Sequence, residues 1–183
     1  MSVYRKALSV LETFNNYMLA AGRQLAWVLV ALMVGSILLQ VFFRYVLNDA
    51  LPWPEEVARA FMIWMMGLVA ASAYRWGGFV AIDMFSDFLP NVLRTILKIL
   101  LLALALVVLA QLFYLAIEFF QRGFRTRAAS FHLPRAWIYL AMPVCFGSML
   151  LVNIELLMRE LGRAFGDAEN YPDPIQPSMA AGE

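Results

Sequence analysis

Four long apolar segments constrain the fold of this chain more than any other feature. They run over residues 25–45, 57–74, 93–118 and 135–158. A helix needs about 20 mostly apolar residues to cross a hydrocarbon core about 30 Å thick, and each segment is close to that length or exceeds it. Because backbone amides in lipid must be satisfied within their own segment, unbroken runs of this kind form helices. The sequence therefore predicts an all-α integral membrane protein with four transmembrane helices.

The composition agrees with a chain whose main surroundings are the lipid bilayer. Hydrophobic residues make up 63% of its 183 residues and charged residues only 15%, far from the balance of a soluble domain. The formal net charge of +1 predicts no nucleic-acid partner. The single cysteine, Cys145, excludes a disulfide within the chain and a C-x-x-C motif.

Two further segments have the pattern of amphipathic interfacial helices. Residues 3–19 carry an apolar stripe at helical spacing, with the charged residues and Asn15 and Asn16 placed elsewhere; the stripe is Val3, Ala7, Val10, Phe14 and Met18. Such a helix lies in the headgroup region or extends the first span. Residues 79–90 set Asp83 and Asp87 four apart on one face. Residues 1–164 are thus expected to form one membrane domain, followed by a polar, proline-rich and disordered tail over residues 165–183.

The distribution of basic residues predicts the orientation. An even number of spans places both termini on one side, which carries eight Lys and Arg residues: Arg5, Lys6, Arg23, Arg75, Arg94, Lys98, Arg159 and Arg163. The opposite side carries six: Arg44, Arg59, Arg122, Arg125, Arg127 and Arg135. The positive-inside rule then favours cytoplasmic termini.

The residues offer little equipment for catalysis, and we expect no enzymatic activity and no catalytic, cofactor or metal site. The single histidine, His132, lies in a loop, so this chain alone cannot supply the two histidines of a bis-histidine haem. Charged residues cluster at the ends of the spans, and only Gln40 and Gln111 are polar and more deeply placed. We expect each amide to hydrogen-bond to a neighbouring helix.

Some residues within the spans favour helix association. Ala31 and Gly35 are four apart, as are Gly67 and Ala71, and pairs of small residues let helix backbones approach closely. Trp64 stands well inside the second span. Its indole N–H is expected to donate to a partner in another helix.

The second span begins with a charged head, "LPWPEEVAR", that includes Trp53, Glu55, Glu56 and Arg59. Glutamates in the first turn oppose the positive end of the helix dipole. Glu55 and Arg59 are four apart and can form an ion pair. Arg44, at the end of the first span, is expected to add a pair across the two helices.

At these residues the sequence resembles the small membrane subunit, or Q-type subunit, of tripartite ATP-independent periplasmic (TRAP) transporters. The resemblance rests on four motifs in order: "FFRYVLN", "WPEEVARAFMIWMMGLVAASAYR", "GGFVAID" and "LPRAWIYLAMPV". It implies a large membrane subunit that binds substrate and sodium, and a periplasmic binding protein that captures an organic acid. The small subunit would then be a non-catalytic scaffold in the bacterial inner membrane, with sodium bound in the large subunit.

Under this interpretation, nine residues are candidates for structural or subunit-interface roles: Arg44, Trp53, Glu55, Glu56, Arg59, Trp64, Gly67, Arg75 and Asp83. Two alternatives from other classes stay open. One is a self-contained homo-oligomeric exporter or channel, which would need a titratable residue near mid-membrane. The other is the haem-binding anchor of a redox enzyme, with His132 as one ligand and the second from a partner.

Overall fold

The computed structural model describes residues 2–49, 51–77, 91–126 and 134–165, and their fold is all-α. The helices are α1 (Ser2–Tyr45), α2 (Trp53–Gly77), α4 (Asn91–Gly123), α5 (Ala136–Tyr139) and α6 (Ala141–Phe165). Four stretches are long and apolar enough to cross a membrane: α1, α2, α4, and α5 with α6 taken together. The predicted fold class, an all-α chain with four candidate membrane spans, is confirmed.

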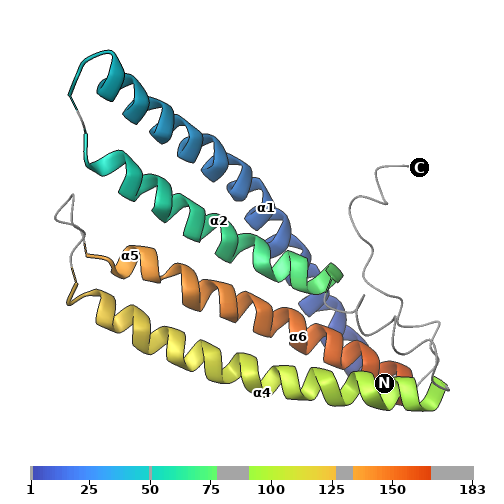
Figure 1. Ribbon diagram of the computed structural model, residues 1–183. Coiled ribbons are helices and arrows are strands. Elements are labelled where there is room, and N and C mark those ends of the chain that lie inside the picture. Colours follow the sequence, from blue (N-terminus) through green and yellow to red (C-terminus); the bar gives the residue numbers. More distant parts are fainter. Residues whose placement is uncertain (1, 50, 78–90, 127–133, 166–183) are drawn as a thin grey trace, which may run out of the picture.

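The helices form a row in the order α1, α2, α6, α4 (Figure 1). α1 and α2 pack as one antiparallel pair and α4 and α6 as another, and α2 joins the pairs by packing against α6. The beginning of α1 also reaches α6, whereas its second half runs beside α2 alone and diverges from the rest (Figure 1). The row is therefore closed at the end where α1 begins and α6 ends, and spread at the other.

α1 is one continuous helix of 44 residues, so residues 3–19 extend the first span. At 1.5 Å per residue its length is about 66 Å. The apolar stripe of this extension faces away from the other helices: Val10 and Phe14 are exposed, whereas Leu8, Asn15 and Leu19 are buried. The reason is that α6 presents polar side chains here, so α1 turns a polar residue inward and its apolar stripe outward.

The last span is interrupted once, at Leu140 between α5 and α6. Pro143 follows three residues later. Proline has no N–H with which to bond the carbonyl of Tyr139, and its ring crowds that carbonyl. The interruption is therefore the local consequence of Pro143.

All four spans contribute to one small core near the closed end. Its buried members are Leu19, Ala71, Leu102, Val152 and Leu156. They come from α1, α2, α4 and α6, so this core holds the two helix pairs together.

Small residues bring the backbones close at two crossings beside this core. A Cβ added at Gly67 would lie 3.1 Å from the carbonyl oxygen of Ala141, which confirms close approach at the predicted Gly67 and Ala71 pair. A Cβ at Gly22 would lie 3.0 Å from the Leu68 carbonyl oxygen. By contrast, a Cβ at Gly35 would meet nothing within 4 Å, so the Ala31 and Gly35 pair does not pack against another described helix.

Some predicted features lie outside the described residues. They are the interfacial segment 79–90 with Asp83 and Asp87, the loop with His132, and residues 166–183 of the tail. Phe165, the first residue of the predicted tail, still belongs to α6.

Candidate functional site: a polar cluster at the closed end

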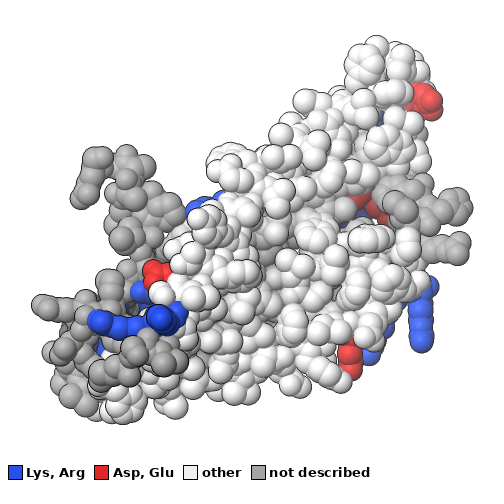
Figure 2. Space-filling view, turned by 180° about the vertical axis from the view of Figure 1, so that it is seen from behind, with Lys and Arg blue, Asp and Glu red and all other residues white. Residues whose placement is uncertain are grey.

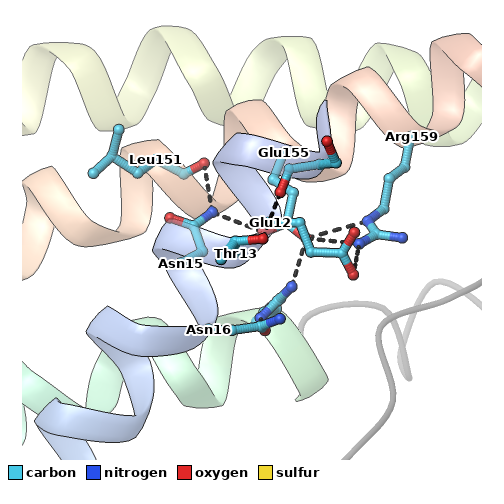
Figure 3. A network of polar contacts seen from close by, with 9 residues as sticks. Glu12, Thr13, Asn15, Asn16, Leu151, Glu155 and Arg159 are labelled. Carbon is cyan, nitrogen blue, oxygen red and sulfur yellow. Dashed lines mark hydrogen bonds and ion pairs between the residues drawn. The ribbon is translucent and has the colours of Figure 1, made fainter. Parts of the chain in front are cut away.

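The carboxylate of Glu155 is the centre of a buried polar cluster formed by Glu12, Asn15, Asn16, Arg75, Glu155 and Arg159 (Figure 3). Glu155 lies on α6 with none of its surface exposed. Its Oε1 accepts from Arg75 Nη2 of α2 at 2.5 Å and from Arg159 Nη2 at 3.0 Å, and its Oε2 accepts from Asn15 Nδ2 of α1 at 2.7 Å. One carboxylate thus joins three helices.

The two arginines extend the cluster to a second carboxylate and a second amide. Arg159 Nη2 lies 2.7 Å from Glu12 Oε1 on α1. Arg75 Nη1 donates to Asn16 Oδ1 at 2.5 Å. Both guanidinium groups are almost fully buried, with 4% of each residue exposed. Glu12 and Asn15 both point from α1 toward α6 (Figure 3).

The charges of the cluster balance. Two carboxylates, Glu12 and Glu155, face two guanidinium groups, Arg75 and Arg159. A buried charge needs a partner of opposite sign and hydrogen bonds for its remaining polar atoms. Each charge here has a partner of opposite sign, whereas Arg75 Nε and Asn15 Oδ1 are buried without a hydrogen-bond partner among the described residues. The cluster therefore links α1, α2 and α6 mainly through its ion pairs.

A second polar layer ties in the fourth helix. Asn153 of α6 is fully buried; its Nδ2 donates to the Leu102 carbonyl of α4 at 3.1 Å, and its Oδ1 accepts from the Tyr74 hydroxyl of α2 at 2.7 Å. The Tyr4 hydroxyl of α1 also donates to the Met158 carbonyl of α6. Hydrogen bonds and ion pairs therefore connect all four spans at this end.

The charged head of α2 lies at the opposite, spread end and is built differently. Glu55 and Arg59 form the predicted ion pair at 2.9 Å, but their side chains are 65% and 67% exposed. Arg44 forms no ion pair among the described residues, and its guanidinium lies over the ring of Tyr45. The expected pair between Arg44 and the head of α2 is therefore wrong: Arg44 is exposed and interacts within its own helix.

The remaining candidates have separate positions. Trp53 is partly exposed at the start of α2, and Glu56 is half-buried beside it. The indole N–H of Trp64 donates to the Trp137 carbonyl of α5 at 3.1 Å, which confirms its predicted partner in another helix. Of the eight candidates that lie within the described residues, only Arg75 belongs to the cluster.

Sequence reasoning missed the assembly of the cluster. From the sequence, Glu155 is expected near a span boundary and Arg159 among the basic residues on the side of the termini, and Asn153 is not singled out. A signal was present: "VNIELLMRE" places Asn153, Glu155 and Arg159 in an apolar run, and charges four apart on a helix can pair. The contribution of Asn15 and Asn16 needed the tertiary structure.

The amides of Gln40 and Gln111 do not behave as expected. Neither makes a hydrogen bond to a neighbouring helix among the described residues. Gln111 is exposed on α4 and Gln40 is half-buried on α1. The expected bond to a neighbouring helix is therefore not formed within the described residues, and the prediction remains for a helix outside them.

The described residues contain no group of three or more His, Cys, Asp or Glu that could hold a metal ion. A cavity of about 210 Å³ lies between α1, α2 and α6, and the residues at its wall include Met18, Leu19, Leu68, Pro143 and Val144. The wall of this cavity is mostly apolar; its one hydroxyl, that of Ser148, donates to the Cys145 carbonyl of its own helix at 2.8 Å.

Comparison with known proteins identifies the family. Residues 33–163 match the family model described as "Tripartite ATP-independent periplasmic transporters, DctQ component". The chain is also 28% identical over 128 residues to the sialic acid TRAP transporter small permease protein SiaQ of Vibrio cholerae serotype O1, which covers 70% of this chain and 73% of that protein. The family match covers more than half of the chain. The chain therefore belongs to the DctQ-component family, the small membrane subunits of TRAP transporters.

Proposed function

We propose that the chain is the static, non-catalytic scaffold on which the large membrane subunit of a sodium-coupled TRAP transporter assembles in the bacterial inner membrane. Family membership supports the subunit type. The observation that carries the scaffold role is the absence of ionisable Asp, Glu, Lys or Arg residues between the charged ends of the spans, over residues 24–43, 60–74, 99–117 and 136–154. Ion translocation and proton relay use such residues, so coupling belongs to the large subunit.

The same absence weighs against a self-contained exporter or channel. The four charges of the polar cluster, on Glu12, Arg75, Glu155 and Arg159, are matched among themselves. Movement of the substrate, an organic acid delivered by a periplasmic binding protein, is accordingly assigned to the partners. Both termini are proposed to lie in the cytoplasm, because the basic residues are more numerous on their side.

A seam on α4 is the proposed contact for the large subunit. Exposed residues follow a four-three spacing along this helix, as in a helix-packing seam: Leu100, Leu104, Val107, Gln111 and Tyr114. Hydrocarbon cannot accept or donate the hydrogen bonds of the Gln111 amide, and a partner helix can. An unpaired amide amid these apolar residues therefore favours protein over lipid as the cover of this face.

Co-purification tests the proposal. The chain is expressed with the large subunit and a tag on the latter, and the retained small subunit is measured for the parent and for Gln111→Leu. An interhelical hydrogen bond in a membrane contributes about 0.6 kcal/mol. If Gln111→Leu removes one such bond, the two subunits should associate about threefold more weakly. Gln121→Leu, at an exposed glutamine near the end of the same helix, is the matched control and should retain the parental amount.

An uptake assay distinguishes a scaffold that the large subunit requires from a chain that binds it without affecting transport. Sodium-driven uptake by the large subunit in liposomes should require this chain. If the chain purifies as a stable, monodisperse species and its omission leaves uptake unchanged, the scaffold function is wrong. Flux through liposomes that contain this chain alone would instead favour the exporter or channel.

A further inference from the structure

Arg23 lies on α1 where this helix crosses α2. It follows Gly22, which packs against the Leu68 carbonyl oxygen. Its guanidinium carbon lies 4.7 Å from the ring centroid of Trp76, which is two helical turns beyond Leu68 on α2, about 12 Å along its axis. The side chain therefore reaches along the bundle toward the closed end, as long basic side chains do near a membrane surface.

The guanidinium of Arg23 differs from the other buried cations at this end. Arg75 and Arg159 are paired with Glu155, whereas Arg23 has no acidic partner among the described residues. Its Nη1 is buried without a hydrogen-bond acceptor. The residue as a whole is half-buried, so part of the side chain reaches the surface. The described residues supply no counter-charge for this guanidinium, so an anion bound from outside them would stabilise it.

The position of Trp76 indicates the depth of the Arg23 guanidinium in the membrane. α2 has 25 residues and a length of about 37 Å, slightly more than a hydrocarbon core of about 30 Å. Trp76 is its penultimate residue, and tryptophan prefers the headgroup level. Lys and Arg side chains also gather at this end, whereas the middle of the molecule is nearly uncharged (Figure 2).

The geometry points to a binding site in which Arg23, whose guanidinium lies over the ring of Trp76, binds the phosphate of a phospholipid headgroup, with net-anionic lipids preferred. A guanidinium can donate two parallel hydrogen bonds to phosphate oxygens, and the aromatic face stabilises the cation in one orientation. Free inorganic phosphate has the same chemistry. We favour the lipid because the neighbouring residues on α1, Leu25, Trp27 and Val28, are exposed and offer an apolar surface for acyl chains.

Quenching of Trp76 fluorescence tests this site. The full chain is reconstituted in vesicles of phosphatidylcholine and phosphatidylglycerol, in which either one lipid or the other carries bromine near the headgroup. Subtraction of the signal from Trp76→Phe isolates Trp76. In the parent, brominated phosphatidylglycerol should quench Trp76 about fivefold more effectively than brominated phosphatidylcholine. This factor corresponds to the attraction of about 1 kcal/mol between one basic residue and an anionic membrane surface.

Three variants and one competitor separate the outcomes. Arg23→Gln should lose the preference, and Arg5→Gln, at an exposed arginine on the same helix, should keep it. Arg23→Lys keeps the charge without the bidentate geometry and should keep part of the preference, which provides a measurement if Arg23→Gln does not fold. Equal preference in the parent and Arg23→Gln would overturn the proposal. A melting temperature raised by inorganic phosphate in the parent alone, without any lipid preference, would identify free phosphate and also overturn the lipid site.

Discussion

The two ends of the bundle use the same residue types in opposite ways. At the closed end, Arg75 and Glu155 are 4% and 0% exposed and meet across two helices at 2.5 Å. At the spread end, Arg59 and Glu55 meet within one helix at 2.9 Å and are 67% and 65% exposed. A glutamate and an arginine thus define a tertiary contact in one place and a helix start in the other.

The difference shows which end determines the fold of the subunit. Breaking a buried ion pair by removal of one partner leaves an uncompensated charge, whereas an exposed pair contributes little. The spans also differ in how much of them the rest of the chain buries. In the most apolar stretch of 18 residues, 6% of α1 is buried, compared with 28% of the last span. The closed end therefore maintains the tertiary structure, and the spread end leaves surface available to other molecules.

The largest expected effect comes from Glu155→Gln. This change leaves Arg75 without its carboxylate partner in a buried site, and it removes one of the two carboxylates that pair with Arg159 in the described structure. We expect a loss of about 3–5 kcal/mol in the free energy of unfolding, measured by unfolding in mixed detergent micelles. Glu118→Gln is the matched control, because Glu118 pairs with Arg122 at an exposed site. Equal effects of the two changes would refute the contrast between the ends.

Next in size is Gly67→Leu, which tests the close approach of α2 and α6. A Cβ at Gly67 already lies 3.1 Å from the Ala141 carbonyl oxygen, so a leucine must push the helices apart. Overpacking of this kind costs about 1–3 kcal/mol. Gly35→Leu makes the same chemical change at a position where a Cβ meets nothing within 4 Å. The same unfolding assay should show that Gly35→Leu is nearly neutral. If Gly35→Leu destabilises the subunit more than Gly67→Leu does, the close approach of α2 and α6 at Gly67 is refuted.

Asn153→Ala should have a smaller effect. It removes the hydrogen bonds to the Leu102 carbonyl and from the Tyr74 hydroxyl. Interhelical hydrogen bonds in membranes average about 0.6 kcal/mol each, so we expect a loss of about 1–2 kcal/mol in the free energy of unfolding. Tyr74→Phe removes only one of the two bonds and should cost about half as much. If Tyr74→Phe costs as much as Asn153→Ala, the bond to α4 contributes nothing.

Much of the architecture followed from the sequence because apolar run length and helix formation are local properties. The four spans, the ion pair of Glu55 with Arg59 and the close approach at Gly67 are of this kind. The polar partner of Trp64 in another helix also followed, since a buried indole N–H favours an acceptor.

The cluster could not be predicted because it depends on residues far apart in the chain. Asn15 and Glu155 are separated by 140 positions, and nothing local to either indicates the other. The orientation of the first part of α1 also depends on tertiary structure: Phe14 of its apolar stripe is exposed and Asn15 is buried, because in a membrane protein a polar face can point inward. In a lipid environment, polarity at a helix crossing is as informative as an apolar stripe.

The smallest expected effect on subunit stability, and the test of the spread end, is Glu55→Ala combined with Glu56→Ala. The exposed pair of Glu55 with Arg59 contributes only about 0.3–0.5 kcal/mol to the helix, so the unfolding free energy should change little. We expect complex formation with the large subunit, measured by co-purification, to weaken more than substrate preference, measured by competition in uptake assays. Asp49→Ala removes another exposed carboxylate at this end and should leave both measurements unchanged. Normal assembly with altered selectivity would instead place the head of α2 in the path of the substrate, and the division of roles between the two ends would not hold.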